Sequence, residues 1–320
     1  MRIAVDAMGG DHAPQEIIAG AVRWSDETSS TVILVGREAD IKKELKQLEY
    51  DPARVEIVHA AEVIGMEESP AAALRKKKDS SIVVATKLVK EKQADALISC
   101  GSTGAQMAAA IFILGRMEGI ERPPVIAALP NLSGSFTYLV DLGANVDCKP
   151  KQLLQFAVLG NAYTQLSAGM ANPRIALLSN GSEATKGNST TIEVHNILKE
   201  QKGLNFIGNI EGRDIFSNSA DVIVCDGFVG NIVLKTIEGM ASFLARALSK
   251  ETGHVPALFN KLDYTQVGGA PLLGIDGISI VCHGSSKKEA VFNGMGIAKK
   301  SVHDKIIDAQ KIALSSITEI

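Results

Sequence analysis

Short apolar runs that end in glycine and a small polar or acidic residue recur along the chain, and a helical pattern follows each one. The clearest runs are RIAVDAMGGD, ALISCGSTGA, YLVDLGANVD, RIALLSNGSEATKGN, DVIVCDGFVGN and ISIVCHGSS. Their alternation with helices predicts a mostly parallel sheet with helices on both faces. Such sheets bind ligands at the carboxyl ends of their strands, which is where this chain places glycines and polar side chains. Glycine lets a ligand approach the backbone, and helix N-termini attract anions, so the pattern favours an enzyme that handles a phosphate-bearing small molecule.

One hairpin interrupts the alternation, because two strand patterns at 125–129 and 137–142 are separated only by the turn Asn131–Gly134. The other expected strands are 3–6, 31–36, 55–59, 94–99, 174–178, 205–208, 221–226 and 277–283. The expected helices are 11–24, 39–48, one that starts at Ser69-Pro70, 104–114, 150–166, 189–199, 230–248 and 286–316. No linker marks a boundary, so we predict a single αβα catalytic domain over residues 1–320, in which two lobes would enclose a cleft.

The composition excludes several classes of protein. A length of 320 residues with 46% hydrophobic and 22% charged residues suits a globular enzyme with a large core. A net charge of -3 and an aromatic content of 4% argue against a nucleic acid partner. The start, MRIAVDAMGG, reads as a strand and turn rather than a signal peptide, and no apolar run is long enough to span a bilayer. We therefore expect a cytoplasmic protein.

The four cysteines do not indicate a metal site or a disulfide framework. None belongs to a CxxC pair, and a chain of this size does not need disulfides to fold. Three of them sit in or just after strand patterns, where buried and unreactive thiols are expected. The four positions are Cys100, Cys148, Cys225 and Cys282.

Two loops join a strand end to a helix start in a layout that suits an anion. Thr185–Asn188 follows a strand and opens a helix, so Lys186 would offer a positive charge beside free N–H groups and the positive end of the helix dipole. The GxxxxGK[ST] spacing of a nucleotide P-loop is absent, which leaves a solvated turn lysine as the alternative. Asp226–Asn231 has the same layout, with a simple helix N-cap as the alternative role of Asn231.

Three more strand ends carry polar groups. The hydroxyls and N–H groups of Ser99–Gly104 suit phosphate or an oxyanion, whereas a serine nucleophile is not supported because GxSxG is absent. Asp141–Asn145 offers a carboxylate and an amide, either to orient Lys186 or a substrate group, or as a structural cap. His283–Ser286 places an imidazole at a strand end, where structural and functional roles are equally open.

Two charged segments leave their roles open as well. The loop Asp6–His12 brings two carboxylates and a histidine together, but its spacing does not select metal ligands. Arg75–Lys78 is a run of four cations, which on a helix would form a solvated face or a docking patch for an acidic partner.

With these residues in place, the chain resembles the bacterial phosphate acyltransferase family of phospholipid synthesis over nearly its whole length. The strings that carry the resemblance are DAMGGDHAP, SPAAALRKKKDSS, SCGSTGA, GRMEGIERP, VDLGANVDCKP, DGFVGN followed by LKTIEG, and GGAPLLG followed by HGSS. The resemblance implies a fold of the isocitrate/isopropylmalate dehydrogenase and phosphotransacetylase class. It also implies transfer of a fatty acyl group from an acyl-carrier-protein thioester to inorganic phosphate, which gives acyl-phosphate.

The resemblance implies partners too: acyl-carrier protein, inorganic phosphate, a second copy in a homodimer, peripheral contact with a membrane, and the acyltransferase that uses acyl-phosphate next. No cofactor or metal is implied. The chain departs from the family pattern in Leu178–Glu183, so Lys186 carries over and Ser179 does not. It is also shorter between Leu248 and Tyr264 than many members, which carry a long amphipathic helical pair there.

From the strand-end positions and the resemblance together, we predict two sets of site residues. The catalytic set is Lys186, Asn231 and His283. The substrate-binding set is Ser102, Thr103, Gly104, Asp141, Asn145, Asn188, Asp226, Gly230 and Ser285.

Three alternative functions stay open. A phosphotransacetylase that uses acyl-coenzyme A would need the same strand-end chemistry, so only a substrate assay separates it. A nicotinamide-dependent dehydrogenase of related fold would need an adenosine site, and GxGxxG is absent. A non-catalytic interaction protein would not need so many ligand-type strand ends.

Overall fold

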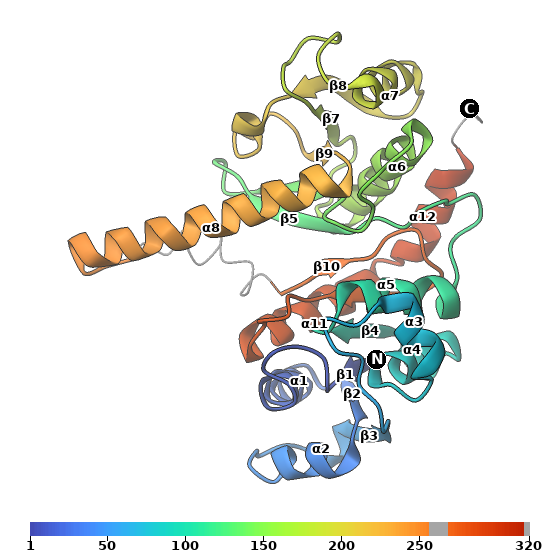
Figure 1. Ribbon diagram of the computed structural model, residues 1–320, viewed down its shortest axis with the longest axis vertical. Helices are drawn as coiled ribbons and strands as arrows, with labels where there is room; N and C mark the ends of the chain where they lie inside the picture. Colours follow the sequence, from blue (N-terminus) through green and yellow to red (C-terminus); the bar gives the residue numbers. More distant parts are fainter. Residues whose placement is uncertain (256–267, 317–320) are drawn as a thin grey trace. The chain divides into compact units, whose positions relative to one another are not determined.

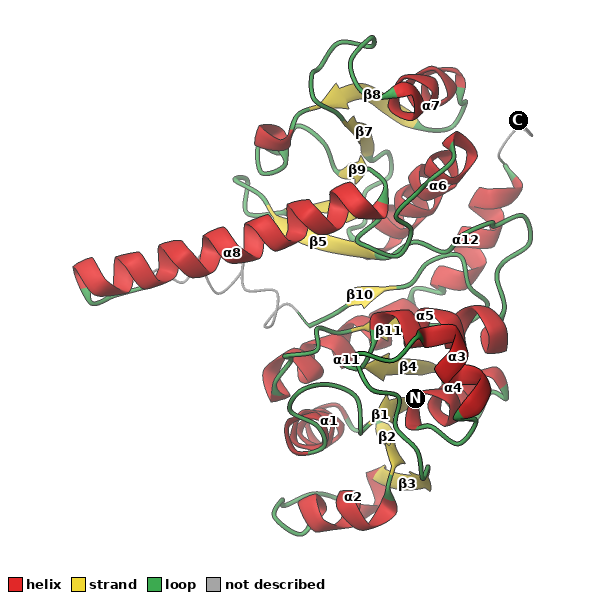
Figure 2. Cartoon of the chain, viewed as in Figure 1, coloured by secondary structure: helices red, strands yellow, loops and turns green. Residues whose placement is uncertain are grey.

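The structure, a computed structural model, describes residues 1–255 and 268–316 (Figure 1, Figure 2). Within these ranges the chain divides into two compact units, residues 1–116 with 268–303 and residues 117–255 with 304–316. Each unit has its own sheet. The shortened region expected between Leu248 and Tyr264 lies, from residue 256 onward, outside the described residues.

The first unit is built on a six-stranded sheet with the order β10-β11-β4-β1-β2-β3. All neighbouring strands are parallel except β10, which is antiparallel to β11. The strands are buried apolar runs, as in Ile3–Val5 and Val32–Val35. Their bounds are β1 (Arg2–Asp6), β2 (Thr31–Gly36), β3 (Val55–His59), β4 (Ala96–Ser99), β10 (Ala270–Pro271) and β11 (Ser279–Val281).

Helices cover both faces of this sheet, with α1 and α11 on one side of it and α3, α4 and α5 on the other (Figure 1). Helix α1 approaches α11 closely, since a Cβ at Gly20 would lie 2.5 Å from the carbonyl oxygen of Lys288. The helices are α1 (Gln15–Thr28), α2 (Glu38–Leu45), α3 (Pro70–Lys76), α4 (Ser81–Lys90), α5 (Thr103–Ala109), which continues as the π-helix η2 (Ala110–Leu114), and α11 (Lys288–His303). A short 3-10 turn, η1, spans Pro52–Arg54.

The second unit has a five-stranded sheet with the order β5-β6-β9-β7-β8. The β5–β6 pair is the predicted antiparallel hairpin, and the other neighbours are parallel. The strands are β5 (Ile126–Pro130), β6 (Phe136–Val140), β7 (Arg174–Leu178), β8 (Asn205–Ile210) and β9 (Val222–Val224). The helices are α6 (Pro150–Ser167), α7 (Ser189–Glu200), α8 (Gly227–Thr252) and α12 (Ile306–Ser315), with a 3-10 turn, η3 (Gly212–Asp214).

The predicted fold class is confirmed, because both sheets are mostly parallel and packed with helices. The expectation of one continuous sheet is wrong, since backbone hydrogen bonding divides the strands between two sheets. The helix expected over 286–316 is also wrong in its continuity. It breaks between α11 and α12, where Lys305 takes a left-handed conformation with φ of 52°.

The run of four cations does not lie on one helix either. Helix α3 ends at Lys76, and Lys77 turns away from helical geometry. The Lys77 ammonium then donates to the carbonyl oxygen of Val63 at 2.8 Å and pairs with Glu68 at 2.6 Å. Only part of the run is therefore available to solvent or to a partner.

Helix α8 is long and carries several exposed apolar side chains. Five of them are Phe228, Ile232, Met240, Phe243 and Leu244. By length and composition alone, α8 is long and apolar enough to cross a membrane, with a mean hydropathy of 1.3 over its most apolar stretch. The expectation that no apolar run is long enough to span a bilayer is wrong for this helix. A few charged residues interrupt its apolar sequence, but the mean hydropathy of its most apolar stretch stays high.

Candidate functional site

In the second unit, three neighbouring parallel strands end side by side and carry polar loops. Strands β6, β9 and β7 are adjacent, and they lead into the loops that begin at Asp141, Cys225 and Ser179. Because parallel strands present their carboxyl ends at one edge, this arrangement gathers the predicted residues of this unit at one end of its sheet.

Asp141 anchors the first of these loops. Its side chain is completely buried, and its two oxygens accept hydrogen bonds from the backbone N–H groups of Val125 (2.9 Å), Ala144 (3.3 Å) and Asn145 (2.7 Å), and from Asn145 Nδ2 (3.0 Å). Burial raises the pKa of Asp141 to about 6, against the lowering effect of these donors. Asn145 is buried too and donates also to the carbonyl oxygen of Pro123 at 3.0 Å. This geometry supports the structural-cap role of Asp141.

The second loop packs tightly on the first through glycines at the start of α8. A Cβ at Gly227 would lie 2.8 Å from the backbone nitrogen of Asn145, and a Cβ at Gly230 would overlap the carbonyl oxygen of Asp141. Asp226 is the N-cap of α8, with Oδ1 accepting from Val229 N at 2.8 Å. Gly227 and Gly230 therefore provide close approach of backbone to backbone.

Asn231 lies in the second turn of α8 and is not its cap. Its side chain is exposed and lies beside Gly143, whose ideal Cβ would be 3.5 Å from Asn231 Oδ1. Within residues 1–255 and 268–316, no hydrogen bond engages its side-chain amide. The N-cap alternative for Asn231 is therefore excluded, and its amide is available to a ligand.

The third loop carries Lys186 into α7. Asn188 is the N-cap of that helix, and its Oδ1 accepts from the backbone N–H and the hydroxyl of Thr191, both at 2.9 Å. The Lys186 side chain is exposed, packs its stem on Gly181, and has no ion-pair partner among the described residues. A free ammonium thus lies next to the N-terminus of a 12-residue helix, a combination that attracts anions.

Ser179 adds a hydroxyl that the sequence analysis left out. Its Oγ is buried and has no hydrogen-bond partner in the described part of the chain. It points at the same loop, since a Cβ at Gly187 would lie 3.2 Å from it. Buried hydroxyls in folded proteins almost always form a hydrogen bond, so a ligand or a water molecule is expected to bind this one. Its place directly after β7, matching Asp141 after β6, is the signal that would have found it.

In the first unit, the strand-end loops of β1, β4 and β11 lie side by side. The backbone N–H of Asp11 donates to Gly284 at 2.8 Å, and a Cβ at Gly9 would lie 2.7 Å from the nitrogen of Gly101. Asp6 is buried and accepts from Ser99 Oγ at 2.7 Å, and burial raises its pKa. The small hollow beside these groups, about 10 Å³, has room for roughly one water molecule and not for a substrate.

The predicted site residues of the first unit differ in how far packing and hydrogen bonds within the protein already engage them. Ser102 caps α5 by accepting from Ala105 N at 3.4 Å, and Gly104 lies against Pro70. Thr103 is exposed. His283 Nδ1 lies 3.2 Å from the backbone nitrogen of Ser285 and 2.7 Å from the Ser285 hydroxyl, so this ring nitrogen is engaged within its own loop. Among the described residues, no group of three or more His, Cys, Asp or Glu side chains is placed to hold a metal ion.

The expected cysteine environments are confirmed. Cys100, Cys225 and Cys282 are buried and Cys148 is half-buried, all as free thiols. Burial raises the pKa of Cys148 to about 12 and that of Cys225 well above its ordinary value. The thiols of Cys148 and Cys225 are therefore unreactive at neutral pH.

Comparison with known proteins identifies the family. A family model described as fatty acid synthesis protein matches residues 1–309. A phosphate acyltransferase from Syntrophomonas wolfei is 62% identical over 319 residues, which cover 99% of this chain and 100% of that protein. The chain belongs to the phosphate acyltransferase family. Another member, from Heliobacterium modesticaldum, is 52% identical over 324 residues and covers 97% of this chain and 96% of its own. The resemblance seen in the sequence is confirmed, and the protein is an acyltransferase of fatty acid synthesis.

Solved structures show the same fold at low identity. The EutD phosphotransacetylase from Staphylococcus aureus matches with a TM-score of 0.62 and 18% identity, covering 94% of both chains. A 4-hydroxythreonine-4-phosphate dehydrogenase from Klebsiella pneumoniae matches with a TM-score of 0.55 and 13% identity, covering 98% of this chain and 99% of its own. These likenesses establish the α/β fold that this phosphate acyltransferase family member shares with them.

Proposed function

We propose that the protein transfers a fatty acyl group from an acyl-carrier-protein thioester to inorganic phosphate, which gives acyl-phosphate for phospholipid synthesis and releases the carrier protein. The observation that carries this proposal is the loop before α7. This loop carries the unpaired ammonium of Lys186, and the unpaired hydroxyl of Ser179 lies against its Gly187. The helix that follows presents the positive end of its dipole to the same loop. Groups of these kinds bind phosphate ions in proteins, which supports the proposal.

This reaction depends on holding phosphate against the thioester more than on a strong general base. Phosphate is already an anion at neutral pH, so one of its oxygens attacks the thioester carbonyl carbon when the two are held together. The carbonyl oxygen becomes an oxyanion, the C–S bond then breaks, and the thiolate leaves with the carrier. We assign Lys186 to phosphate or to the developing oxyanion, and the free amide of Asn231 to donation toward the same charge.

The remaining site assignments are proposals of the same kind. In the first unit, we assign His283 as a catalytic residue and Ser102, Thr103, Gly104 and Ser285 to substrate binding. In the second unit, Asn188, Asp226 and Gly230 shape the loops that present Lys186 and Asn231, and Asp141 with Asn145 fixes the backbone on which they pack.

We also propose that the protein is a cytoplasmic homodimer, with peripheral membrane contact and delivery of acyl-phosphate to the next acyltransferase. The exposed apolar side chains of α8 support association with a second copy or with a membrane, because exposed apolar patches mark protein–protein and membrane interaction surfaces.

The decisive experiment incubates the protein with an acyl-carrier-protein thioester and labelled inorganic phosphate. We expect labelled acyl-phosphate and free carrier thiol in equal amounts. Acyl-coenzyme A as the donor is a parallel reaction. If only acyl-coenzyme A gives product, the acyl donor is coenzyme A and not the carrier protein. If neither donor gives product, the proposed acyl transfer to phosphate is wrong.

A further inference from the structure

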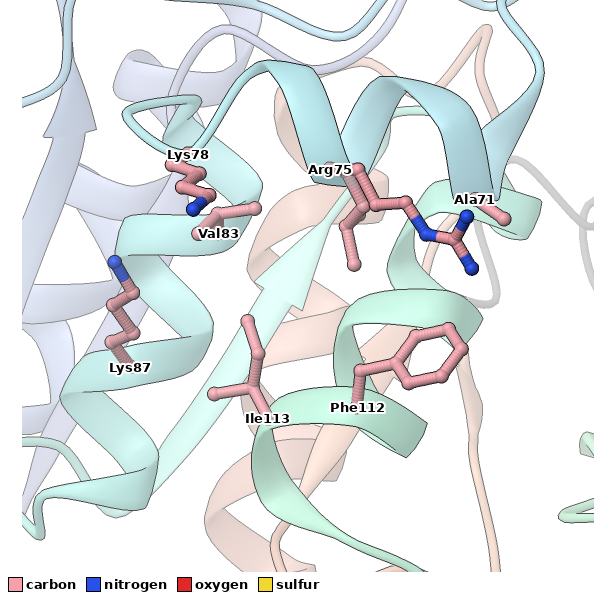
Figure 3. A pocket seen from close by; sticks show the side chains of 8 residues that line it. Ala71, Arg75, Lys78, Val83, Lys87, Phe112 and Ile113 are labelled. Atoms are coloured by element: carbon pink, nitrogen blue, oxygen red, sulfur yellow. The ribbon is translucent and has the colours of Figure 1, made fainter.

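An apolar hollow of about 310 Å³ lies in the first unit (Figure 3). Helix α3, helix α4 and η2 surround it, and Leu74, Val83, Phe112 and Ile113 supply its apolar lining. The benzyl side chain of Phe112 is 68% exposed. The volume is at the lower end of the range for specific ligand pockets, about 300–1,000 Å³.

Three cations line the same hollow: Arg75, Lys78 and Lys87. None of them has an ion-pair or hydrogen-bond partner within residues 1–255 and 268–316, whereas their neighbour Lys77 is paired with Glu68. Figure 3 shows Lys78 and Lys87 together on one side of the hollow, and Arg75 reaching over Phe112 on the other. Positive charge therefore flanks the apolar floor from two sides.

Cations on two sides of an apolar floor favour a partner that carries negative charge on both sides of an apolar group. A small amphiphile has one anionic head group and would neutralise one flank only. An acidic helix that presents an apolar side chain between carboxylates would fill the floor and meet both flanks. Exposed aromatic residues and arginine around an apolar centre are also enriched at protein interfaces.

We propose that this hollow docks an acidic helix of the acyl-carrier protein, with an apolar side chain of that helix seated against Phe112 and Ile113. The proposal rests on the proposed function, which makes the carrier protein a substrate. The docking surface differs from the patch expected from the sequence at Arg75–Lys78. Lys77 is not part of it, because Lys77 is paired with Glu68, and Lys87 is added.

The hollow stands at a suitable distance from the predicted substrate-binding residues of the same unit. Helix α5 begins at Thr103 and runs without interruption through η2, so Ile113 lies ten residues further along one helical segment. At the α-helical rise of 1.5 Å per residue this is at most about 15 Å, because the π-helical turn of η2 is more compact. A carrier protein delivers its acyl group on a flexible prosthetic arm, so docking at this distance leaves the thioester within reach of Ser102 and Thr103.

The test compares two double charge reversals of equal size. Lys78→Glu with Lys87→Glu changes the hollow, and Lys43→Glu with Lys46→Glu changes exposed lysines on and after α2. Binding of carrier protein without an acyl group is measured directly at low salt, and KM is measured for the acyl-carrier thioester and for a small uncharged thioester. Phe112→Ala tests the apolar part with no change of charge.

We expect the hollow variant to raise the carrier Kd and KM about tenfold or more and to flatten their salt dependence, since close opposite charges speed encounter. The small thioester and the α2 variant should keep wild-type values, and Phe112→Ala should weaken carrier binding at all salt concentrations. Equal losses in both double variants, or an unchanged carrier Kd in the hollow variant, would overturn the proposal. Binding of oleate that the hollow variant abolishes, with carrier binding intact, would reassign the hollow to an anionic lipid. Wild-type protein that makes no acyl-phosphate from the carrier thioester would refute the proposed function itself.

Discussion

Asn209 ties the loop that carries Lys186 to strand β8. Its Nδ2 donates a 2.9 Å hydrogen bond to the carbonyl oxygen of Glu183, and the backbone N–H of Lys186 donates to that same oxygen at 3.0 Å. Asn209 Oδ1 in turn lies 2.8 Å from Nδ1 of the buried His195 on α7. A chain of three residues thus holds the backbone of the predicted phosphate loop between a strand and a helix.

Replacing Asn209 with alanine should weaken phosphate binding more than turnover. One lost hydrogen bond is worth about 1 kcal/mol, so the KM for phosphate should rise roughly fivefold, while kcat at saturating phosphate changes little. Asn205→Ala is the matched control, because its amide donates at the start of the same strand to Asn172. An equal rise in the KM for phosphate in both variants would show that the effect comes from disturbing β8 as a whole and not from the Asn209–Glu183 hydrogen bond.

Lys186→Ala should remove the positive charge from the loop before α7. If the ammonium stabilises phosphate or the oxyanion, turnover should fall by about 100- to 1,000-fold, the usual effect of removing one oxyanion donor. Circular dichroism should show an unchanged fold, since the side chain is exposed. Lys199→Ala, in the last turn of α7, serves as the control. Near-normal activity across phosphate concentrations would contradict the role of Lys186.

Asn231→Ala should lower kcat/KM by about tenfold or more without changing the melting temperature. The amide is exposed and makes no hydrogen bond in the described part of the chain, so its loss leaves no buried group unpaired. Thr236→Ala, an exposed position further along α8, is the comparison. Loss of stability without loss of activity would assign Asn231 to the fold instead.

Asp141 should make the protein less stable as the pH rises from about 4 to above 6. The folded-state pKa of about 6 lies above the ordinary value of 3.8, so the folded state binds more protons than the unfolded state in this window. The free energy of unfolding of the wild type, minus that of Asp141→Asn, should therefore fall by up to about 3 kcal/mol across it. Urea unfolding at each pH measures the difference. A difference that is flat, or that rises with pH, would contradict the burial of the charge.

The apolar stripe of α8 should hold two copies together. Phe243 is 65% exposed, and Phe243→Glu would place a charge in a dimer surface, so the protein should sediment as a monomer at concentrations where the wild type is a dimer. Ser242→Glu is the control, because this exposed neighbour lies about 100° around the helix from Phe243 and carries the same added charge. A wild type that is monomeric, and that binds phospholipid vesicles through Phe243, would assign the stripe to a membrane surface.

The sequence by itself determined most of the elements. Continuous apolar runs, the Ser69-Pro70 helix start and the hairpin turn at Asn131–Gly134 are local signals, and strands and helices form at them. The break between α11 and α12 and the elements α4 and β10 were not predicted. The glycine and polar residues after β6, β7 and β9 likewise mark the strand ends at which the loops of Asp141, Lys186 and Asn231 lie. These features depend on the chemistry of neighbouring residues, which the sequence displays directly.

Only the tertiary structure decided which strands share a sheet and which polar groups find partners. The division into two sheets depends on backbone pairing between distant segments, which no local pattern records. Asp141 is saturated by donors from Val125 and Asn145, while Ser179 Oγ is left unpaired, and Lys77 alone among its neighbours is neutralised by Glu68. Each outcome follows from side chains that meet only after folding, so burial and pairing in space, and not residue type, separate the groups that hold the fold from those free to bind.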